Sequence, residues 1–342
     1  MLVNVLRKLV RPVAQGGSCG NPLFPKERIM GKPYTTYEQQ IEILKSKRLI
    51  ISDDKEVMDL LKRCSYFGLV TGYKNPFKDK KGFYKVRTTI HDIYALYTYD
   101  MELRELFLKY ILIIENHIKS LISYAFCDSY GDMESNYLNA TNYDYTIIKQ
   151  DGINKFIGKL REVINDSEKH AYLQHQKKRH GNIPLWALIR ALTIGVVSKM
   201  YSFLKPQEQT MVSKEFECVT ENELAQMIDL LSRFRNVCAH NERLYDYKYN
   251  KGGIQDTDVH SILNIKRQKN RYVYGKNDLF AVVIVFKYLL SNEDFSAFID
   301  SLKTKTKELL NKTNILQEAQ ILKLMGFPNN WDIIRDCSKA RE

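Results

Sequence analysis

Residues 89–126 set the strongest constraint on the fold, because their side chains follow the spacing of an α-helix over about ten turns. The members of the apolar stripe are Leu103, Leu106, Phe107, Tyr110, Ile114, His117, Ile118, Leu121 and Ala125. One or two helices of this length cannot bury such a stripe alone, so other helices must pack against it. The stretch therefore predicts an all-α fold.

Several other segments have helical periodicity and recognisable starts. Thr35 and Glu38 have the spacing of a capping box and predict a helix over 36–48. Pro184 is placed to open a buried helix that runs to Leu204. Further helices are expected over 147–169, 279–290, 295–310 and 315–324, whereas 130–145 has the composition of a loop.

The balance of charge points to an anionic partner. The chain of 342 residues has 52 Lys and Arg against 40 Asp and Glu, which gives a formal net charge of +12. Such a balance favours nucleic acid or a membrane surface. No apolar run reaches the ~18 residues that a membrane helix needs, and the run at 280–290 is interrupted by Lys287. We therefore expect no membrane association.

The cysteines and the common catalytic motifs narrow the class of protein. The six cysteines are scattered without a Cys-x-x-Cys pair, as expected of reduced thiols in a cytoplasmic protein. Phosphate-binding glycine loops and a His-Glu-x-x-His motif are missing from the sequence. Nucleotide-loop enzymes and zinc peptidases are thus unsupported.

Three basic clusters are candidates for RNA binding. The first contains Lys74, Lys78, Lys80, Lys81, Lys85 and Arg87, the second Lys177, Lys178 and Arg179, and the third Lys266, Arg267 and Arg271. Aromatic residues are interleaved in the first and third clusters, where rings can stack on bases while cations meet phosphates. The alternative for each cluster is a solvated loop whose aromatic rings anchor it to the core.

Histidines outside the motif described next are weaker candidates. His170, His175 and His180 lie near the second cluster, but spacings of five residues do not place them on one helical face. We therefore expect no metal and no cofactor. His117, on the apolar stripe, has the position of a core histidine, and Arg104 beside that stripe is a further candidate for the site.

The densest group of functional side chains lies at 235–245. Thr220 and Glu223 form a capping box that begins a helix. Arg235 falls on the apolar side of this helix, where a charge is costly unless it is paired or faces a cleft. His240 lies about 140° further around an ideal helix, on the face of Asn236. For Arg235 and His240 to act on one substrate, a second chain must contribute or the helix must end near Ala239.

The string from Arg235 to Tyr245, Arg-Asn-x-Cys-Ala-His-Asn-Glu-Arg-Leu-Tyr, resembles the signature of bacterial abortive-infection (Abi) proteins of the AbiD/AbiF type, within the HEPN superfamily. Other matching segments, in order, are Lys32-Pro33 through Ile51, Leu61 through Leu69 with Gly72-Tyr73, Asp100-x-x-Leu103-Arg104 through Ile122, and Pro184-Leu185-Trp186 with Gly195. The resemblance covers 32–250. It implies a HEPN-like helical bundle there, with residues 1–31 as an extension and 251–342 as a helical segment packed on the bundle.

The resemblance also implies a function, metal-independent cleavage of RNA by an Arg-x4-His motif. In that interpretation His240 is the acid or base, Arg235 stabilises the transition state, and Asn236 orients His240 or the phosphate. Asn241, Glu242 and Arg243 are supporting residues, and Glu242 is a candidate to hold Arg235 or Arg243. HEPN ribonucleases usually pair two motifs, so a homodimer is implied.

Three alternatives remain open from the sequence. The polar residues of the motif can form a buried network that only locks helices together. The protein can bind a small noncoding RNA that restrains a toxin, without cutting it. It can also be a protein-interaction module in phage defence.

Overall fold

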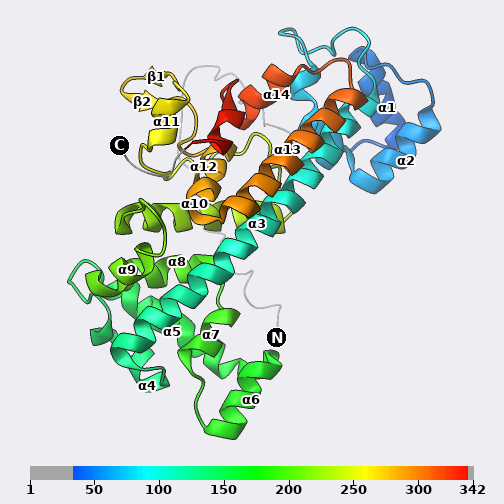
Figure 1. The fold of residues 1–342 in the computed structure, drawn as a ribbon. Helices are drawn as coiled ribbons and strands as arrows, with labels where there is room; N and C mark the ends of the chain where they lie inside the picture. The colour runs from blue at the N-terminus through cyan, green and yellow to red at the C-terminus, as the bar shows by residue number, and fades with distance from the viewer. Residues whose placement is uncertain (1–33, 338–342) are drawn as a thin grey trace, which may run out of the picture.

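The computed structural model describes residues 34–337, and its axis is the helix α3, Ile90–Tyr130 (Figure 1). Its 41 residues span about 60 Å at the rise of an α-helix. Thr89 and Asp92 form a capping box at its start, and Gly131 ends it at φ +79°. The prediction of an all-α fold is confirmed, and the helices packed along α3 bury most of its apolar side chains.

The amino-terminal end of α3 carries a small group of helices. These are α1 (Tyr37–Ser46) and α2 (Asp54–Cys64), followed by a π-helical turn at Tyr66–Thr71. The capping box of α1 is formed by Thr36 and Gln39, so the sequence-based choice of Thr35 and Glu38 was wrong by one residue. Two adjacent threonines followed by Glu and Gln fit either register, and the sequence alone could not separate them.

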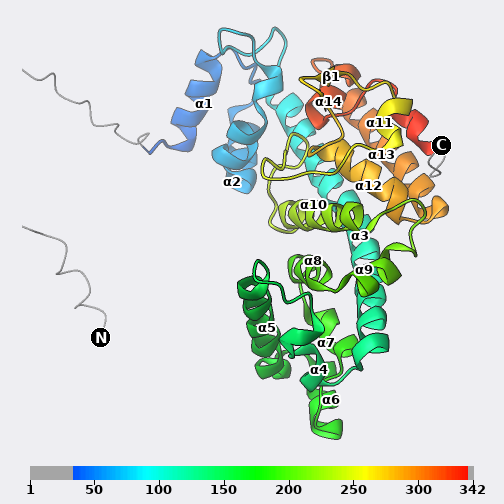
Figure 2. The same ribbon diagram turned by 90° about the vertical axis from the view of Figure 1, so that its left-hand side faces the viewer.

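Helices α4 to α9 lie beside the carboxyl-terminal half of α3, where α7, α8 and α9 contact it (Figure 2). Their bounds are α4 Glu134–Tyr137, α5 Gln150–Asn165, α6 Ala171–His180, α7 Leu185–Ala191, α8 Ile194–Phe203 and α9 Pro206–Ser213. The single helix predicted over 185–204 is therefore two helices. Leu192 and Thr193 are extended between them, with ψ of 141° and 154°. Leu192 stays buried, so the apolar pattern continues across the break and conceals it.

The remaining helices and strands lie toward the amino-terminal half of α3, and α10 and α13 pack directly on it. They are α10 Glu221–Ala239, α11 Asp258–Ile262, β1 Arg267–Gln268, β2 Arg271–Tyr272, α12 Leu279–Leu289, α13 Asn292–Lys312 and α14 Glu318–Met325. Helix α10 crosses α3, and α13 runs along it. The rings of Phe107, Tyr110, Phe286 and Phe298 join α3, α12 and α13, with centroids 4.9–6.2 Å apart. Short 3-10 turns occupy Asn75–Phe77, Ala140–Asn142, Ser167–Lys169 and Trp331–Arg335.

Two features of the carboxyl-terminal region bear on the sequence analysis. The hairpin β1–β2 was not predicted; Lys269 and Asn270 turn it with φ of 49° and 59°. Helix α12 is the apolar run interrupted by Lys287, and all its residues are buried. The Lys287 ammonium donates a hydrogen bond to the carbonyl of Arg335 at 2.9 Å. Within residues 34–337 the helices that are long enough to cross a bilayer are too polar, and the most apolar one is too short.

Two glycines test this packing with the same substitution. At Gly326, which ends α14 at φ +81°, a Cβ atom would lie 2.3 Å from the buried Asp278 carboxylate that caps α12. At Gly158, within α5, a Cβ atom meets nothing within 4 Å. We expect Gly326→Ala to lower the free energy of unfolding by more than about 1 kcal/mol. Gly158→Ala should raise it by about 0.5–1 kcal/mol. Urea denaturation of both variants measures this, and equal effects would contradict the packing described at Gly326.

Candidate functional site

The motif segment marks the end of α10. Thr220 and Glu223 make the predicted capping box at the start of this helix. The helix ends at Ala239 and His240 is its C-cap. Of the two alternatives given for the motif, a second chain or a helix end near Ala239, the helix end is observed. Asn241 follows at φ +56°, a conformation that Asn adopts more readily than most residues. The N–H groups of Asn241 and Glu242 donate back to the carbonyls of Cys238 and Val237, which closes the helix as a Schellman motif.

The three predicted catalytic residues gather around the last turn of α10. Arg235 is half-buried, and Asn236 and His240 are exposed. The Arg235 Nε atom is buried and has no hydrogen-bond partner among residues 34–337. In the same part of the chain the side chains of Asn236 and His240 form no hydrogen bond or ion pair. A guanidinium left unpaired at a helix end costs free energy unless a ligand or another chain pairs with it.

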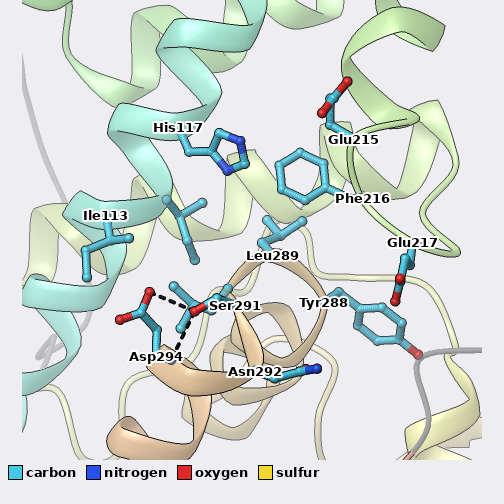
Figure 3. A pocket seen from close by; sticks show the side chains of 12 residues that line it. Ile113, His117, Glu215, Phe216, Glu217, Tyr288, Leu289, Ser291, Asn292 and Asp294 are labelled. Carbon is cyan, nitrogen blue, oxygen red and sulfur yellow. Dashed lines mark hydrogen bonds between the residues drawn. The ribbon is translucent and has the colours of Figure 1, made fainter.

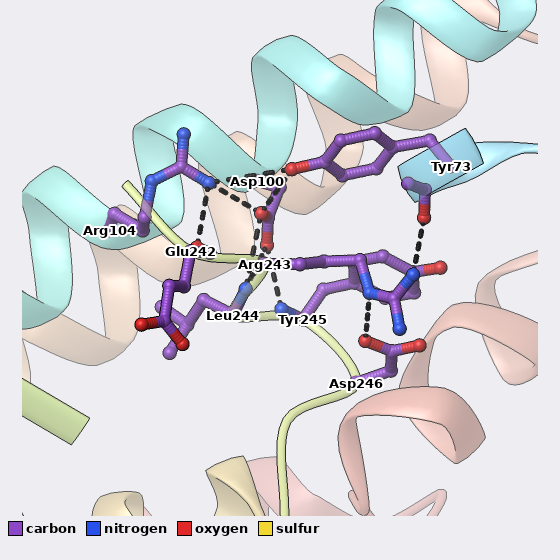
Figure 4. Close-up of polar contacts among 9 residues, drawn as sticks. Tyr73, Asp100, Arg104, Glu242, Arg243, Leu244, Tyr245 and Asp246 are labelled. Atoms are coloured by element: carbon purple, nitrogen blue, oxygen red, sulfur yellow. Dashed lines mark hydrogen bonds and ion pairs between the residues drawn. The ribbon is translucent and has the colours of Figure 1, made fainter. Parts of the chain in front are cut away.

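The segment after His240 is held by a buried carboxylate on α3 (Figure 4). The Asp100 carboxylate accepts hydrogen bonds from the N–H groups of Leu244, at 3.1 Å, and Tyr245, at 2.6 Å. It also accepts from the Tyr73 hydroxyl at 2.7 Å and pairs with Arg104 at 2.6 Å. Four separate donors therefore converge on one side chain that is completely buried.

Arg104 extends this network to the end of the motif. Its Nη1 atom lies 3.3 Å from the carbonyl oxygen of Glu242, to which it donates, as well as bonding Asp100. Arg104 is buried, so it is not an open candidate for binding substrate. Because Arg104 and Asp100 both contact the chain just after Asn241, they fix the direction in which the backbone leaves His240.

Arg243 joins the motif to the amino-terminal helices. Its guanidinium donates to the Gly72 carbonyl through Nη1 and to Asp246 through Nε, both at 2.6 Å. The Tyr73 and Tyr245 rings stack beside it, with centroids 5.9 Å apart. The suggestion that Glu242 holds Arg235 or Arg243 is therefore not borne out: Asp246 is the carboxylate that pairs with Arg243.

The electrostatics of this network follow from burial. Burial raises the pKa of Asp100, while the Tyr73 hydroxyl, the Arg104 charge and the two backbone N–H groups lower it. All of these donors match an ionised carboxylate, which is the form that the network fits. Burial raises the pKa of Cys238 to about 12, so this thiol stays protonated and is no candidate nucleophile.

The basic clusters lie at separate places on the molecule. The second cluster is on α6, at one end, while the third is on the β1–β2 hairpin and the first precedes α3, both at the other end (Figures 1 and 2). In the first cluster Phe77 and Tyr84 are core residues, the Lys78 ammonium lies over Tyr84, and Lys85 donates to the Pro76 carbonyl. These rings anchor the loop and cannot stack on bases. The members of the three clusters whose side chains are exposed are Lys80, Lys81, Arg87, Lys177, Lys178, Arg179, Lys266, Arg267 and Arg271.

The remaining histidines differ from the expectations. His117 is exposed, not a core residue, and its ring lies against Phe216 at 5.3 Å. It lines a cavity of about 580 Å³ with Glu215, Glu217 and Asp294 on its rim (Figure 3). His170 is the N-cap of α6, and His175 and His180 lie on that helix. Between Tyr34 and Cys337 no three His, Cys, Asp or Glu side chains are grouped so that they could hold a metal ion.

Comparison with known protein families shows which family the chain belongs to. The family model described as Abi-like protein matches residues 59–246, more than half of the chain. The chain belongs to the Abi-like protein family. Membership suggests a part in abortive infection, a bacterial defence against phage. Among curated proteins nothing matches, and the solved structures also give no match.

The matched region of this Abi-like chain contains every residue of the Asp100 network. It begins in α2 and ends at Asp246, the carboxylate that holds Arg243. Asp100 and Tyr73 had no role in the sequence analysis, although both lie in segments that carried the resemblance. The i, i+4 spacing of Asp100 and Arg104 was the one signal of a pair, but burial and the contact with residues 242–245 appear only in the folded chain.

Removing the central carboxylate tests the network. We expect Asp100→Asn to lower the free energy of unfolding by about 3–5 kcal/mol, because Arg104 stays buried without its counter-charge. Asp151→Asn in α5 is the matched control, since it breaks an i, i+4 pair with Lys155 that is exposed. That change should cost less than about 1 kcal/mol. Denaturant unfolding compares the two, and similar losses would argue against a central role for Asp100.

Proposed function

We propose that this Abi-like protein is a cytoplasmic, metal-independent endoribonuclease of the HEPN superfamily, of the AbiD/AbiF type, acting in phage defence. The single observation that supports this best is the buried Arg235 Nε atom, which has no partner within residues 34–337 and belongs to the same helix end as an exposed His240. A residue that only locked helices together would have its hydrogen bonds satisfied, as Arg104 and Arg243 do in the same network.

The chemistry that suits these side chains is cleavage by the ribose 2′-hydroxyl. The 2′-oxygen attacks the adjacent phosphorus and the bond to the 5′-oxygen breaks, so one proton is removed and another is supplied. An imidazole is suited to either task near neutral pH. A guanidinium can hold two oxygens of the crowded phosphorane, whose negative charge it stabilises. In this assignment His240 transfers the proton and Arg235 stabilises the negative charge of the phosphorane. Asn236 orients His240 or the phosphate.

One histidine does not serve both sides of this reaction well, because base and acid act at opposite oxygens. The described chain has one Arg-x4-His motif, so the proposal includes a homodimer in which a second copy supplies the other His240. The exposure of His240 and Asn236 at the end of α10 allows such a pairing. Asn241 supports the site by its positive φ, and Arg243 does so through Gly72 and Asp246.

RNA binding without cleavage is the second candidate function, in which the protein holds a small noncoding RNA of a toxin–antitoxin pair. The observation that favours it is the exposure of Lys80, Lys81 and Arg87 in the first cluster and of Lys178 and Arg179 on α6. Phosphate contacts from such side chains make binding fall steeply with salt. Purified protein that contains RNA, with no cleavage by any variant, would favour this candidate. An interaction module for proteins predicts neither RNA nor a strong salt dependence.

Substitution of His240 separates cleavage from binding. We expect His240→Ala to reduce RNA cleavage by about 10²–10⁴-fold, because the group that transfers the proton is lost. RNA affinity should be kept, because the substitution removes no cation that binds phosphate. His117→Ala is the matched control, since it removes an exposed histidine from the middle of α3. Cleavage rates and affinities of the three proteins give the answer, and full activity in His240→Ala would contradict the assignment.

Two further conditions examine the same mechanism. Cleavage should persist in EDTA, because the proposed acid, base and charge stabiliser are side chains. Arg235→Lys should lower the cleavage rate by about 10²-fold or more, since an ammonium cannot hold two oxygens in one plane. Loss of activity in EDTA that returns with added Mg²⁺ would overturn the metal-independent mechanism.

A further inference from the structure

A second cavity lies in the carboxyl-terminal region, and its lining begins shortly after the motif segment. It has a volume of about 620 Å³ and lies between the loop at 250–254, the strand β2 and the segment before α12. The polar side chains that line it are Asn250, Lys251, Asp256, Arg271, Tyr272, Lys276 and Asn277. This volume is in the range of sites that hold a small molecule or one unit of a polymer. We call it the 250–277 cavity.

The loop that forms one wall of the 250–277 cavity is fixed in place. The Tyr249 N–H donates to the Asn277 carbonyl at 2.8 Å, and the Ile254 N–H donates to the Lys276 carbonyl at 2.9 Å. Between them Gly253 lies so close that a Cβ atom would be 2.3 Å from the Lys276 carbonyl oxygen. Gly253 therefore allows the loop to lie against the opposite wall, and the cavity is part of the fold.

The charges of the 250–277 cavity are mainly positive. Asp256 accepts from Lys276 at 2.6 Å and from Arg267 at 3.3 Å, and the Lys276 hydrogen bond is the main cause that lowers its pKa. Asp256 therefore stays ionised and orients two cations. Lys251 and Arg271 are exposed at the cavity and form no ion pair with any residue from 34 to 337. Two unpaired cations beside an oriented third one form a site for an anion with several oxygens.

The aromatic ring at the cavity is already occupied. The Tyr272 ring stacks on His260 with centroids 4.7 Å apart, and the Arg267 guanidinium carbon lies 4.2 Å from its centroid. His260 is itself buried and hydrogen-bonded to the Gly275 carbonyl through Nε2. The ring therefore has no free face for a nucleobase. Phosphate oxygens are therefore the groups that suit the cations of this cavity, and contacts to them carry no base preference.

We propose that the 250–277 cavity binds phosphodiester groups of an RNA strand, with Lys251 and Arg271 as the contacts, and that it does so without base preference. The inference rests on the proposed function for its ligand, RNA, and adds where and how the strand is held. The acidic cavity beside His117 gives the contrast within the same chain, because Glu215, Glu217 and Asp294 would repel a phosphate there.

The test measures RNA affinity against salt in the full chain with His240→Ala, so that no RNA is cut. The cavity variant is Lys251→Gln with Arg271→Gln. The control variant is Lys269→Gln with Lys307→Gln, which removes the same charge from two exposed side chains outside the cavity lining, one in the turn of the hairpin and one on α13. Single-stranded oligouridine and oligoadenosine are the ligands, and uridine 5′-monophosphate distinguishes a strand site from a site for a free nucleotide.

We expect the cavity variant to lower the slope of log affinity against log salt by about 1.4, since each single-strand phosphate contact contributes about 0.7. The loss should be equal for both oligonucleotides, and the control variant should keep the parent slope. Equal losses in the two variants would show diffuse attraction and overturn the proposal. So would a loss confined to one base, no RNA binding by the parent, or uridine 5′-monophosphate binding as tightly as RNA.

The outcome is independent of whether the motif cuts RNA. The same cavity substitutions placed in the chain with His240 intact should weaken RNA binding but leave the cleavage rate at saturating RNA unchanged. Absence of cleavage by the protein with His240 intact would refute the proposed ribonuclease while the salt slopes still decide the cavity. A fall in the saturating rate in the cavity variant would contradict a role limited to holding the strand.

Discussion

The buried Asp100 carboxylate is the interaction on which the candidate site depends. It lies on α3 and receives donors from Tyr73, which follows the π-helical turn, from α3 itself and from the backbone after α10. Each of these donors, if left buried without a partner, would cost about 1–3 kcal/mol. The Asp100 carboxylate thus joins segments that lie within the family match. The direction in which the backbone leaves His240 is determined by α3 as well as by α10.

The same region contains one polar group that the protein does not satisfy. Arg104 and Arg243 are bonded to carboxylates and carbonyls, whereas the Arg235 Nε atom has no partner within the described residues. The Schellman turn at Asn241 ends α10 directly after the side chains of the motif. A rigid frame with an unpaired cation at its edge is the arrangement expected of an anion-binding or catalytic site, since the cost of the unpaired group is tolerated for function.

Local patterns explain what could be predicted from the sequence. The all-α fold follows from the periodicity of α3, and the Thr220–Glu223 capping box and the end of α10 near Ala239 are local features that a short stretch encodes. The break at Leu192–Thr193 and the role of Asp100 were missed because each depends on contacts between distant segments. The interleaved aromatics of the basic clusters left base stacking and anchoring to the core as alternatives, and Tyr84 and Tyr272 are used within the protein. Alternation of residue types does not show which way a ring points.

The most direct test of the account is the chemistry of the RNA ends that the protein produces. Attack by the 2′-hydroxyl with His240 and Arg235 must leave a 2′,3′-cyclic phosphate on one fragment and a 5′-hydroxyl on the other. Mass spectrometry of the fragments from a defined single-stranded RNA, cut in EDTA, would show both ends. Fragments with a 3′-hydroxyl and a 5′-phosphate would mean that water is the nucleophile, and they would contradict the assignment of Arg235 and His240 as the catalytic pair.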